Sequence, residues 1–220
     1  MSSSSAFAAV IFDMDGVLVD GEPIYYGAAS KVLAEDGYTF PLDRYKRYMG
    51  TKSGWNEFVE DLGLPRSSSY YRDRCDKLIA DGYLSVESGL PGAVDLVQGL
   101  RELGIPLAVA SSSRRANVET CLNRLGIADD FDAVVTGSDI TDGKPAPDIY
   151  LRAAGLLGVF PSQCLAIEDA PAGIRAAQAA GMTCWAVRTD YTRDLPLPNP
   201  DRVLESLEQV DLADIVGVLA

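Results

Sequence analysis

The stretch FAAVIFDMDG, residues 7–16, decides the fold. Residues 7–12 form a continuous apolar run with β-branched members, which is typical of a strand buried on both faces of a parallel sheet. Similar runs follow at 105–110, 132–137, 164–168 and 183–187. Helix-like stretches separate them, and glycine soon follows each stretch, near 92–103, 114–125, 147–157 and 171–180. Strands that alternate with helices predict βαβ units, and therefore an α/β fold with a parallel sheet.

Residues 21–87 interrupt this alternation. They contain several helix-like patterns, near 23–35, 42–49, 53–62 and 69–81, and no convincing buried strand. We therefore expect a helical domain at 21–87 that is inserted into a core made of residues 1–20 and 88–220. The chain crosses between the two domains twice, so we expect a hinge at these borders.

The composition of the chain argues against several classes of function. The chain has 220 residues, of which 47% are hydrophobic, enough to bury a full core. Its net charge of −13 argues against a nucleic-acid partner. The Ser-rich start does not resemble a signal peptide, no apolar run reaches the length of a membrane span, and the cysteines form no C-x-x-C pair. We expect a cytoplasmic protein with reduced thiols, either a monomer or a homodimer.

The absence of histidine removes Ser-His-Asp and Cys-His catalysis, and also histidine-ligated metals. Any catalytic chemistry must therefore come from carboxylates, lysine, hydroxyl groups and a hard cation.

Polar residues follow four of the predicted strands. In an open parallel sheet, ligands bind beyond the carboxyl ends of the strands, where these residues would meet. The clusters are Asp13 and Asp15, then Ser111, Ser112 and Ser113 with Arg114, then Lys144, and finally Glu168 and Asp169. Taken singly, each cluster also fits a helix cap, a turn or a solvated loop. Their joint order along the chain favours a site for phosphoryl transfer.

Phosphoryl transfer requires charge neutralisation and positioning. Asp13, Asp15, Glu168 and Asp169 offer the hard oxygen ligands that suit Mg²⁺. Ser111 and Lys144 offer contacts to a phosphate. In the absence of histidine, an aspartate is the natural nucleophile, and the second acid, Asp15, can exchange protons with the leaving oxygen and with water.

These motifs resemble the haloacid dehalogenase-like hydrolase superfamily, and more closely its β-phosphoglucomutase-like phosphatase and mutase branch. The resemblance spans nearly the whole chain. It rests on VIFDMDGVLVDGEP at 10–23, VASSS at 109–113, GKPAPDIY at 143–150 and IEDAPAGIRAAQAAGM at 167–182.

The resemblance implies a Rossmann-like core with an all-helical cap domain inserted after the first strand. It also implies that Asp13 is the nucleophile, that Asp15 is the acid/base, and that Ser111 and Lys144 hold the phosphate. Mg²⁺ would be bound by the Asp13 carboxylate, the Asp15 backbone carbonyl and Asp169, with Glu168 as a direct or water-mediated ligand.

The chain departs from the pattern of this branch where the substrate is expected to bind. Members often carry D-S-E-P-x-H after the first motif, whereas this chain has Gly21 in place of the serine and Tyr25 in place of the histidine. The segment at 50–55 resembles a substrate-specificity loop, in which Lys52 could meet a second anionic group or be a solvated lysine beside a packed tryptophan. Ser113 and Arg114 could bind a distal anionic group, and Arg114 fits equally well as an exposed residue at a helix start.

The leading interpretation is a Mg²⁺-dependent phosphatase that acts on a small phosphorylated metabolite, with sugar phosphates, phosphoglycolate and nucleotides all open. The alternative is a sugar phosphomutase, which would return the phosphoryl group of Asp13 to a sugar hydroxyl. A non-catalytic metabolite-binding protein is disfavoured because Asp13, Asp15 and Lys144 are all present.

Overall fold

The computed structural model describes residues 7–47 and 55–217. Within these ranges the strands are β1 (Ala9–Phe12), β2 (Leu107–Ser111), β3 (Ala133–Thr136), β4 (Cys164–Glu168), β5 (Thr183–Val187) and β6 (Arg202–Leu204). The α-helices are α1 (Glu22–Glu35), α2 (Leu42–Tyr45), α3 (Trp55–Leu62), α4 (Ser68–Leu84), α5 (Ala93–Glu102), α6 (Arg115–Leu125), α7 (Asp148–Leu157), α8 (Pro171–Ala179) and α9 (Leu212–Val216). Short 3-10 helices lie at Ala128–Asp130, Pro161–Gln163 and Leu207–Gln209.

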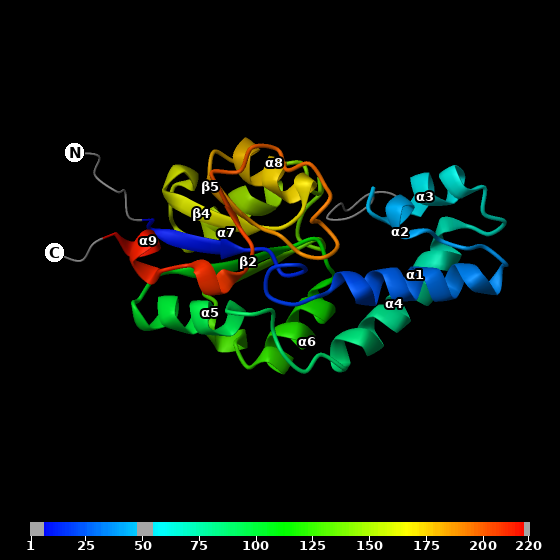
Figure 1. Ribbon diagram of the computed structural model, residues 1–220, viewed down its shortest axis with the longest axis horizontal. Helices are drawn as coiled ribbons and strands as arrows, with labels where there is room; N and C mark the ends of the chain where they lie inside the picture. Colours follow the sequence, from blue (N-terminus) through cyan, green and yellow to red (C-terminus); the bar gives the residue numbers. More distant parts are fainter. Residues whose placement is uncertain (1–6, 48–54, 218–220) are drawn as a thin grey trace.

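The strands form one parallel sheet in the order β3-β2-β1-β4-β5-β6 (Figure 1). β1 lies inside the sheet, with Phe12 opposite Val109 of β2 and Ile167 of β4. This confirms the predicted α/β fold with a parallel sheet. β6 is three residues long and was not predicted from the sequence.

Helices cover both faces of the sheet because each inner strand is apolar on both sides. Val10 and Phe12 of β1 pack into a core cluster with α5 and α6, while Ala9 and Ile11 pack into a second cluster with α7 and α8. Figure 1 shows these two pairs of helices on opposite sides of the sheet. The continuous apolar run of β1 therefore serves two cores.

Helices α1 to α4 lie together at one end of the molecule, on the side toward which the chain leaves β1 (Figure 1). The chain leaves the sheet region and returns to it at adjacent points, since the backbone N–H of Leu90 donates to the carbonyl of Leu18 at 3.0 Å. A second contact joins the helical segment to the loop after β5, where Lys46 Nζ lies 3.2 Å from Asp194 Oδ2.

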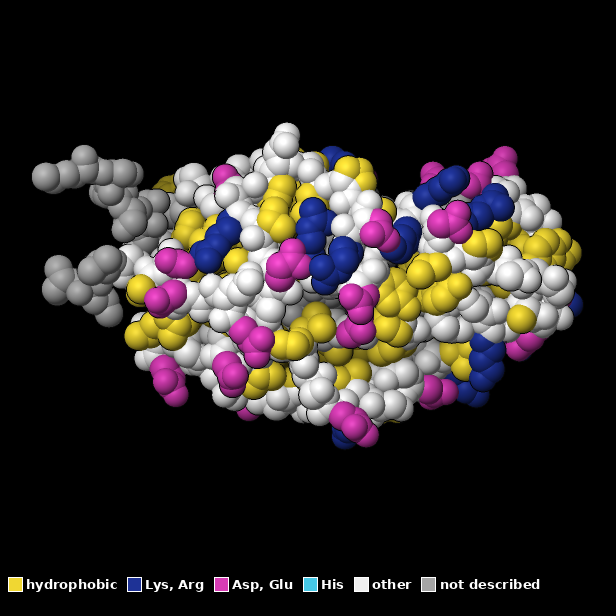
Figure 2. Space-filling model, viewed as in Figure 1, with side chains coloured by type: hydrophobic (Ala, Val, Ile, Leu, Met, Phe, Trp, Pro, Cys, Tyr) yellow, Lys and Arg dark blue, Asp and Glu magenta, His cyan; other side chains and the backbone are white. Residues whose placement is uncertain are grey.

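Acidic side chains are spread over the face shown in Figure 2, interspersed with Lys and Arg. This distribution agrees with the net charge of −13. None of the described helices combines the length and the apolar character needed to cross a membrane.

Candidate active site

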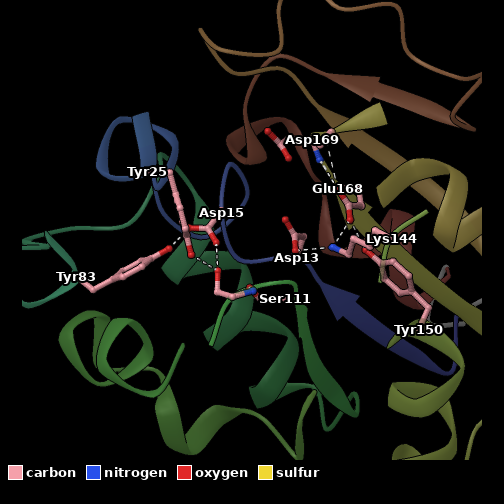
Figure 3. A network of polar contacts seen from close by, with 11 residues as sticks. Asp13, Asp15, Tyr25, Tyr83, Ser111, Lys144, Tyr150, Glu168 and Asp169 are labelled. Atoms are coloured by element: carbon pink, nitrogen blue, oxygen red, sulfur yellow. Dashed lines mark hydrogen bonds and ion pairs between the residues drawn. The ribbon is translucent and has the colours of Figure 1, made fainter. Parts of the chain in front are cut away.

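Most of the charged and hydroxyl residues singled out in the sequence lie at the carboxyl ends of the three central strands. Asp13 directly follows β1, Ser111 ends β2, and Glu168 ends β4. Lys144 comes from the loop between β3 and α7 and reaches the same point (Figure 3). The parallel order of β2, β1 and β4 thus brings together residues that are up to 155 positions apart in the chain.

Lys144 is buried between two carboxylates. Its Nζ lies 2.7 Å from Asp13 Oδ1 and 2.6 Å from Glu168 Oε1. Tyr150 also donates to Glu168 Oε1, at 2.7 Å. Burial alone would lower the pKa of Lys144, but the Asp13 and Glu168 carboxylates raise it, and the net direction is upward. Lys144 therefore stays cationic beside Asp13.

Asp13, Glu168 and Asp169 form a buried acidic cluster, with one oxygen from each within 4.8 Å of the others. The pKa of Asp13 is raised to about 8, chiefly by burial and also by the Glu168 and Asp15 carboxylates, whereas Lys144 lowers it. Burial likewise raises the pKa of Asp169 well above its ordinary value. The cluster holds more acidic groups than Lys144 alone can neutralise.

Asp169 supplies an oxygen that fits a cation. Its Oδ2 is buried and has no hydrogen-bond partner among the described residues, and such an atom is costly unless a ligand satisfies it. The cluster of carboxylate oxygens can hold a hard metal ion.

Gly16 allows Asp169 to lie against the loop that follows β1. Its φ of +85° lies in the left-handed region. A Cβ atom at Gly16 would be 2.1 Å from Asp169 Oδ2. The glycine therefore serves both the turn and the close approach of the acidic cluster.

Asp15 turns toward the helical segment. Tyr83 of α4 donates to Asp15 Oδ1, and Ser113 Oγ donates to Asp15 Oδ2 at 2.7 Å. The hydroxyl of Tyr25 in α1 is hydrogen-bonded to Ser113 Oγ at 2.6 Å. Burial raises the pKa of Asp15, while the hydrogen bonds from Tyr83 and Ser113 lower it. Both carboxylate oxygens of Asp15 are thus occupied by hydroxyl donors.

Some of the remaining residues predicted from the sequence lie at this site, and others do not. Ser111 is buried and accepts a hydrogen bond from the backbone N–H of Ser113 at 3.1 Å, and Ser112 follows it in the chain, half-buried. Arg114 forms an ion pair with Asp76 of α4, and the side chain of Arg114 is about half exposed. Lys52 lies outside the described residues. The structure thus brings Tyr25 and Ser113 to Asp15, whereas Arg114 contacts an acidic side chain of the helical segment.

Three residues of this region were not predicted from the sequence. Tyr150 was quoted inside the third motif, but its bond to Glu168 was not anticipated. Glu22 lies inside the first motif, and its buried carboxylate accepts a hydrogen bond from Tyr45. No local signal marks Tyr83, which is 68 positions from Asp15 in the chain.

Comparisons with known proteins identify the family of the chain and several similar proteins. Residues 7–181 match the family described as haloacid dehalogenase-like hydrolase. The phosphorylated carbohydrates phosphatase of Thermotoga maritima is 32% identical over 176 residues, which are 79% of this chain and 82% of that protein. The structure of a CbbY variant from Rhodobacter sphaeroides in complex with xylulose-(1,5)bisphosphate has a TM-score of 0.85 at 27% identity, and covers 95% of this chain and 99% of that chain.

A further relative is much longer. Protein SUPPRESSOR OF QUENCHING 1, chloroplastic, from Arabidopsis thaliana is 37% identical over 218 residues, and the match covers 95% of this chain but 20% of that protein. The chain thus spans about a fifth of this relative.

The chain belongs to the haloacid dehalogenase-like hydrolase family. Within this family it is a phosphatase enzyme, as its similarity to the phosphatase of Thermotoga maritima indicates. The resemblance inferred from the four motifs is therefore confirmed.

Proposed function

We propose that this chain hydrolyses the monoester of a small phosphorylated metabolite, a sugar phosphate, through a phosphoryl group carried on Asp13 and with Mg²⁺ as cofactor. The observation that carries the proposal is the buried ion pair between Asp13 and Lys144, which sets a carboxylate nucleophile beside a fixed cation. Glu168 and Asp169 complete the charged set, and Asp15 lies two residues beyond the nucleophile.

The reaction proceeds in two displacements at phosphorus. An oxygen of Asp13 forms a bond to phosphorus as the bond to the substrate alcohol breaks, and Asp15 gives its proton to the leaving oxygen. Water then attacks the phosphoryl group while Asp15 takes one of its protons, which releases phosphate and restores the Asp13 carboxylate. Lys144 and Ser111 bind the phosphoryl oxygens and keep them in line.

The acidic cluster has the donor set that Mg²⁺ prefers. Asp13 and Asp169, with the backbone carbonyl of Asp15, would hold the ion, and Glu168 would bind it directly or through water. The unpartnered Oδ2 of Asp169 supports this assignment. When bound, Mg²⁺ neutralises negative charge on the phosphoryl group and on the carboxylates that surround it.

We further propose that residues 21–87 act as a cap over a core of 1–20 and 88–220. The contacts of Tyr25 and Tyr83 support a role near the chemistry, because both hydroxyls belong to the helical segment and reach the Asp15 group. A sugar phosphate is the favoured substrate, because one relative is named for phosphorylated carbohydrates and a structural neighbour holds a sugar bisphosphate.

The test is to incubate the purified protein with Mg²⁺ and a panel of sugar phosphates, phosphoglycolate and nucleotides, and to measure both free phosphate and isomerised sugar. Asp13→Asn should lower phosphate release by at least ~1,000-fold, because no other group replaces the nucleophile. Asp73→Asn, at an exposed position of α4, is the matched control and should act like the parent protein. Chelation of the metal should abolish phosphate release.

Other results of this assay would contradict the proposed phosphatase activity. Isomerised sugar without phosphate release would identify a mutase instead. Full phosphate release by Asp13→Asn would refute the nucleophile. If no member of the panel turns over while a phosphorylated metabolite still binds, the binding-protein interpretation would replace catalysis.

A further inference from the structure

Hydrogen bonds fix the orientation of the Asp15 carboxylate more closely than the two displacements at phosphorus alone would require. Tyr83 donates to Oδ1 and Ser113 donates to Oδ2, so two hydroxyls on different oxygens define the plane of the carboxylate. Ser113 is itself hydrogen-bonded to Tyr25 at 2.6 Å. In Figure 3, Asp15 lies between the two tyrosines and Asp13.

Tyr83 is a rigid donor. Its side chain is fully buried in α4. Its ring meets the ring of Tyr25 edge to face, with centroids 6.2 Å apart and an interplanar angle of 76°. A buried aromatic ring packed in this way has little freedom to rotate away. The hydroxyl of Tyr83 therefore stays directed at Asp15.

Gly21 leaves the room that this arrangement needs. A Cβ atom at Gly21 would be 1.8 Å from Asp15 Oδ1, and 2.7 Å from Asp15 Cγ. The backbone of Gly21, with φ −81° and ψ −25°, suits any residue. The position of the Asp15 carboxylate, rather than the backbone, thus demands glycine here. This is also the position at which the chain departs from the D-S-E-P pattern of the resembling branch.

We infer that Tyr83 and Gly21 are positioning residues for Asp15, Tyr83 by donating to its Oδ1 and Gly21 by leaving that oxygen space. The inference rests on the proposed function, in which Asp15 protonates the leaving oxygen. The bond between phosphorus and that oxygen breaks as the Asp15 proton moves onto it, and Tyr83 keeps its own proton throughout. A carboxyl group free to rotate would meet the leaving oxygen less often.

The first test removes the Tyr83 hydroxyl and compares two substrates. An alkyl phosphate, such as the best sugar phosphate of the panel, needs a proton on its leaving oxygen, whereas p-nitrophenyl phosphate releases a stabilised anion that does not. The ratio kcat/KM reports the steps up to the first displacement. Tyr83→Phe should lower kcat/KM roughly tenfold or more for the alkyl phosphate, mainly through kcat, and less than about threefold for p-nitrophenyl phosphate.

Tyr71→Phe is the matched control. Tyr71 is also fully buried in α4 and also donates to an aspartate carboxylate, Oδ2 of Asp36 at 2.8 Å. Asp36 lies in the helical segment and takes no part in the proposed chemistry. Tyr71→Phe thus reproduces the loss of a buried hydrogen bond, and kcat/KM for both substrates should stay close to the parent values.

A second variant tests the same inference without changing Tyr83. Gly21→Ala should displace the Asp15 carboxylate and give the same selective loss on the alkyl phosphate. Gly27→Ala is its control, because Gly27 lies in α1, the helix that Gly21 caps, and a Cβ atom there meets nothing within 4 Å. Thermal unfolding of all four variants establishes that each is folded at the assay temperature.

The variant Asp15→Asn distinguishes a failure of the proposed acid role of Asp15 from a failure of the positioning role of Tyr83. It should show a larger selective loss on the alkyl phosphate than Tyr83→Phe does. If Asp15→Asn shows no such selectivity, the acid role of Asp15 fails and the inference with it. If Asp15→Asn is selective but Tyr83→Phe loses nothing, gains activity, or loses both substrates equally, the role of Tyr83 is refuted while the proposed function stands. Parent-like kinetics in Gly21→Ala would refute the role of Gly21.

Discussion

Replacing Glu22 by glutamine should stabilise the metal-free protein at alkaline pH. Glu22 is 6% exposed, and its Oε2 accepts a hydrogen bond from Tyr45. The pKa of Glu22 is raised from 4.5 to about 7, chiefly by burial and also by the Asp15 and Asp20 carboxylates, while the bond from Tyr45 lowers it. The folded protein therefore resists ionisation of this side chain.

The size and sign of the effect follow from linkage. The pKa of Glu22 in the folded state, about 7, lies above the 4.5 of an ordinary glutamic acid. Between these two values the folded state binds more protons than the unfolded state, so stability falls as pH rises. A difference of about 2.5 pKa units corresponds to a loss of roughly 3 kcal/mol, which is absent below pH ~4.5 and complete above pH ~7. Glutamine does not titrate and escapes this loss.

The assay is urea denaturation from pH 4 to 8 in the presence of a chelator, for the parent protein and for Glu22→Gln. The difference between their free energies of unfolding cancels the titration of the other acidic groups. It should shift in favour of Glu22→Gln by roughly 3 kcal/mol between pH 4 and 8. Glu87→Gln, at an exposed position, is the control and should show no such trend. A difference that does not change with pH would refute the reasoning.

Three further perturbations have expected outcomes. Leu107→Ala, in the fully buried β2, should lower the free energy of unfolding by about 2–5 kcal/mol with an unchanged denaturant slope, and a loss below about 1 kcal/mol would contradict the packing described for β2. Mg²⁺ should raise the melting temperature of the parent protein but much less that of Asp169→Asn, and equal shifts would argue against a metal at the acidic cluster. Asp76→Asn should change the free energy of unfolding by less than about 1 kcal/mol, because its ion pair with Arg114 is partly exposed. It should also lower KM for sugar bisphosphates, since Arg114 loses a competing carboxylate, and an unchanged KM would count against anion binding by Arg114.

The strands that carry the site could be predicted because their apolar runs are local and continuous. β1, β4 and β5 each lie inside a run that was visible in the sequence, and the polar residues that follow β1 and β4 could be placed from the strand ends. β6 escaped prediction because it has three residues, one of them the exposed Val203, and follows a proline-rich stretch.

The environment of Asp15 could not be predicted for a different reason. Its contacts with Tyr83 and Ser113 join positions 68 and 98 residues away, and no local pattern encodes them. The same holds for Arg114, whose pairing with Asp76 depends on how α4 lies against α6. Side chains that meet across two parts of the chain are fixed by packing, which periodicity does not reveal.

Because Leu90 is hydrogen-bonded to Leu18, the chain leaves the sheet for the helical segment and returns to it at the same place. Because the chain departs and rejoins side by side, the span between these residues can lengthen, shorten or be exchanged without moving the strands or their register. Tyr25 and Tyr83 lie within this span, so an exchanged segment would also change the hydroxyl groups around Asp15. A library of helical segments grafted between these two leucines would therefore have to keep Gly21 and Tyr83, so that the contacts of Asp15 stay as they are.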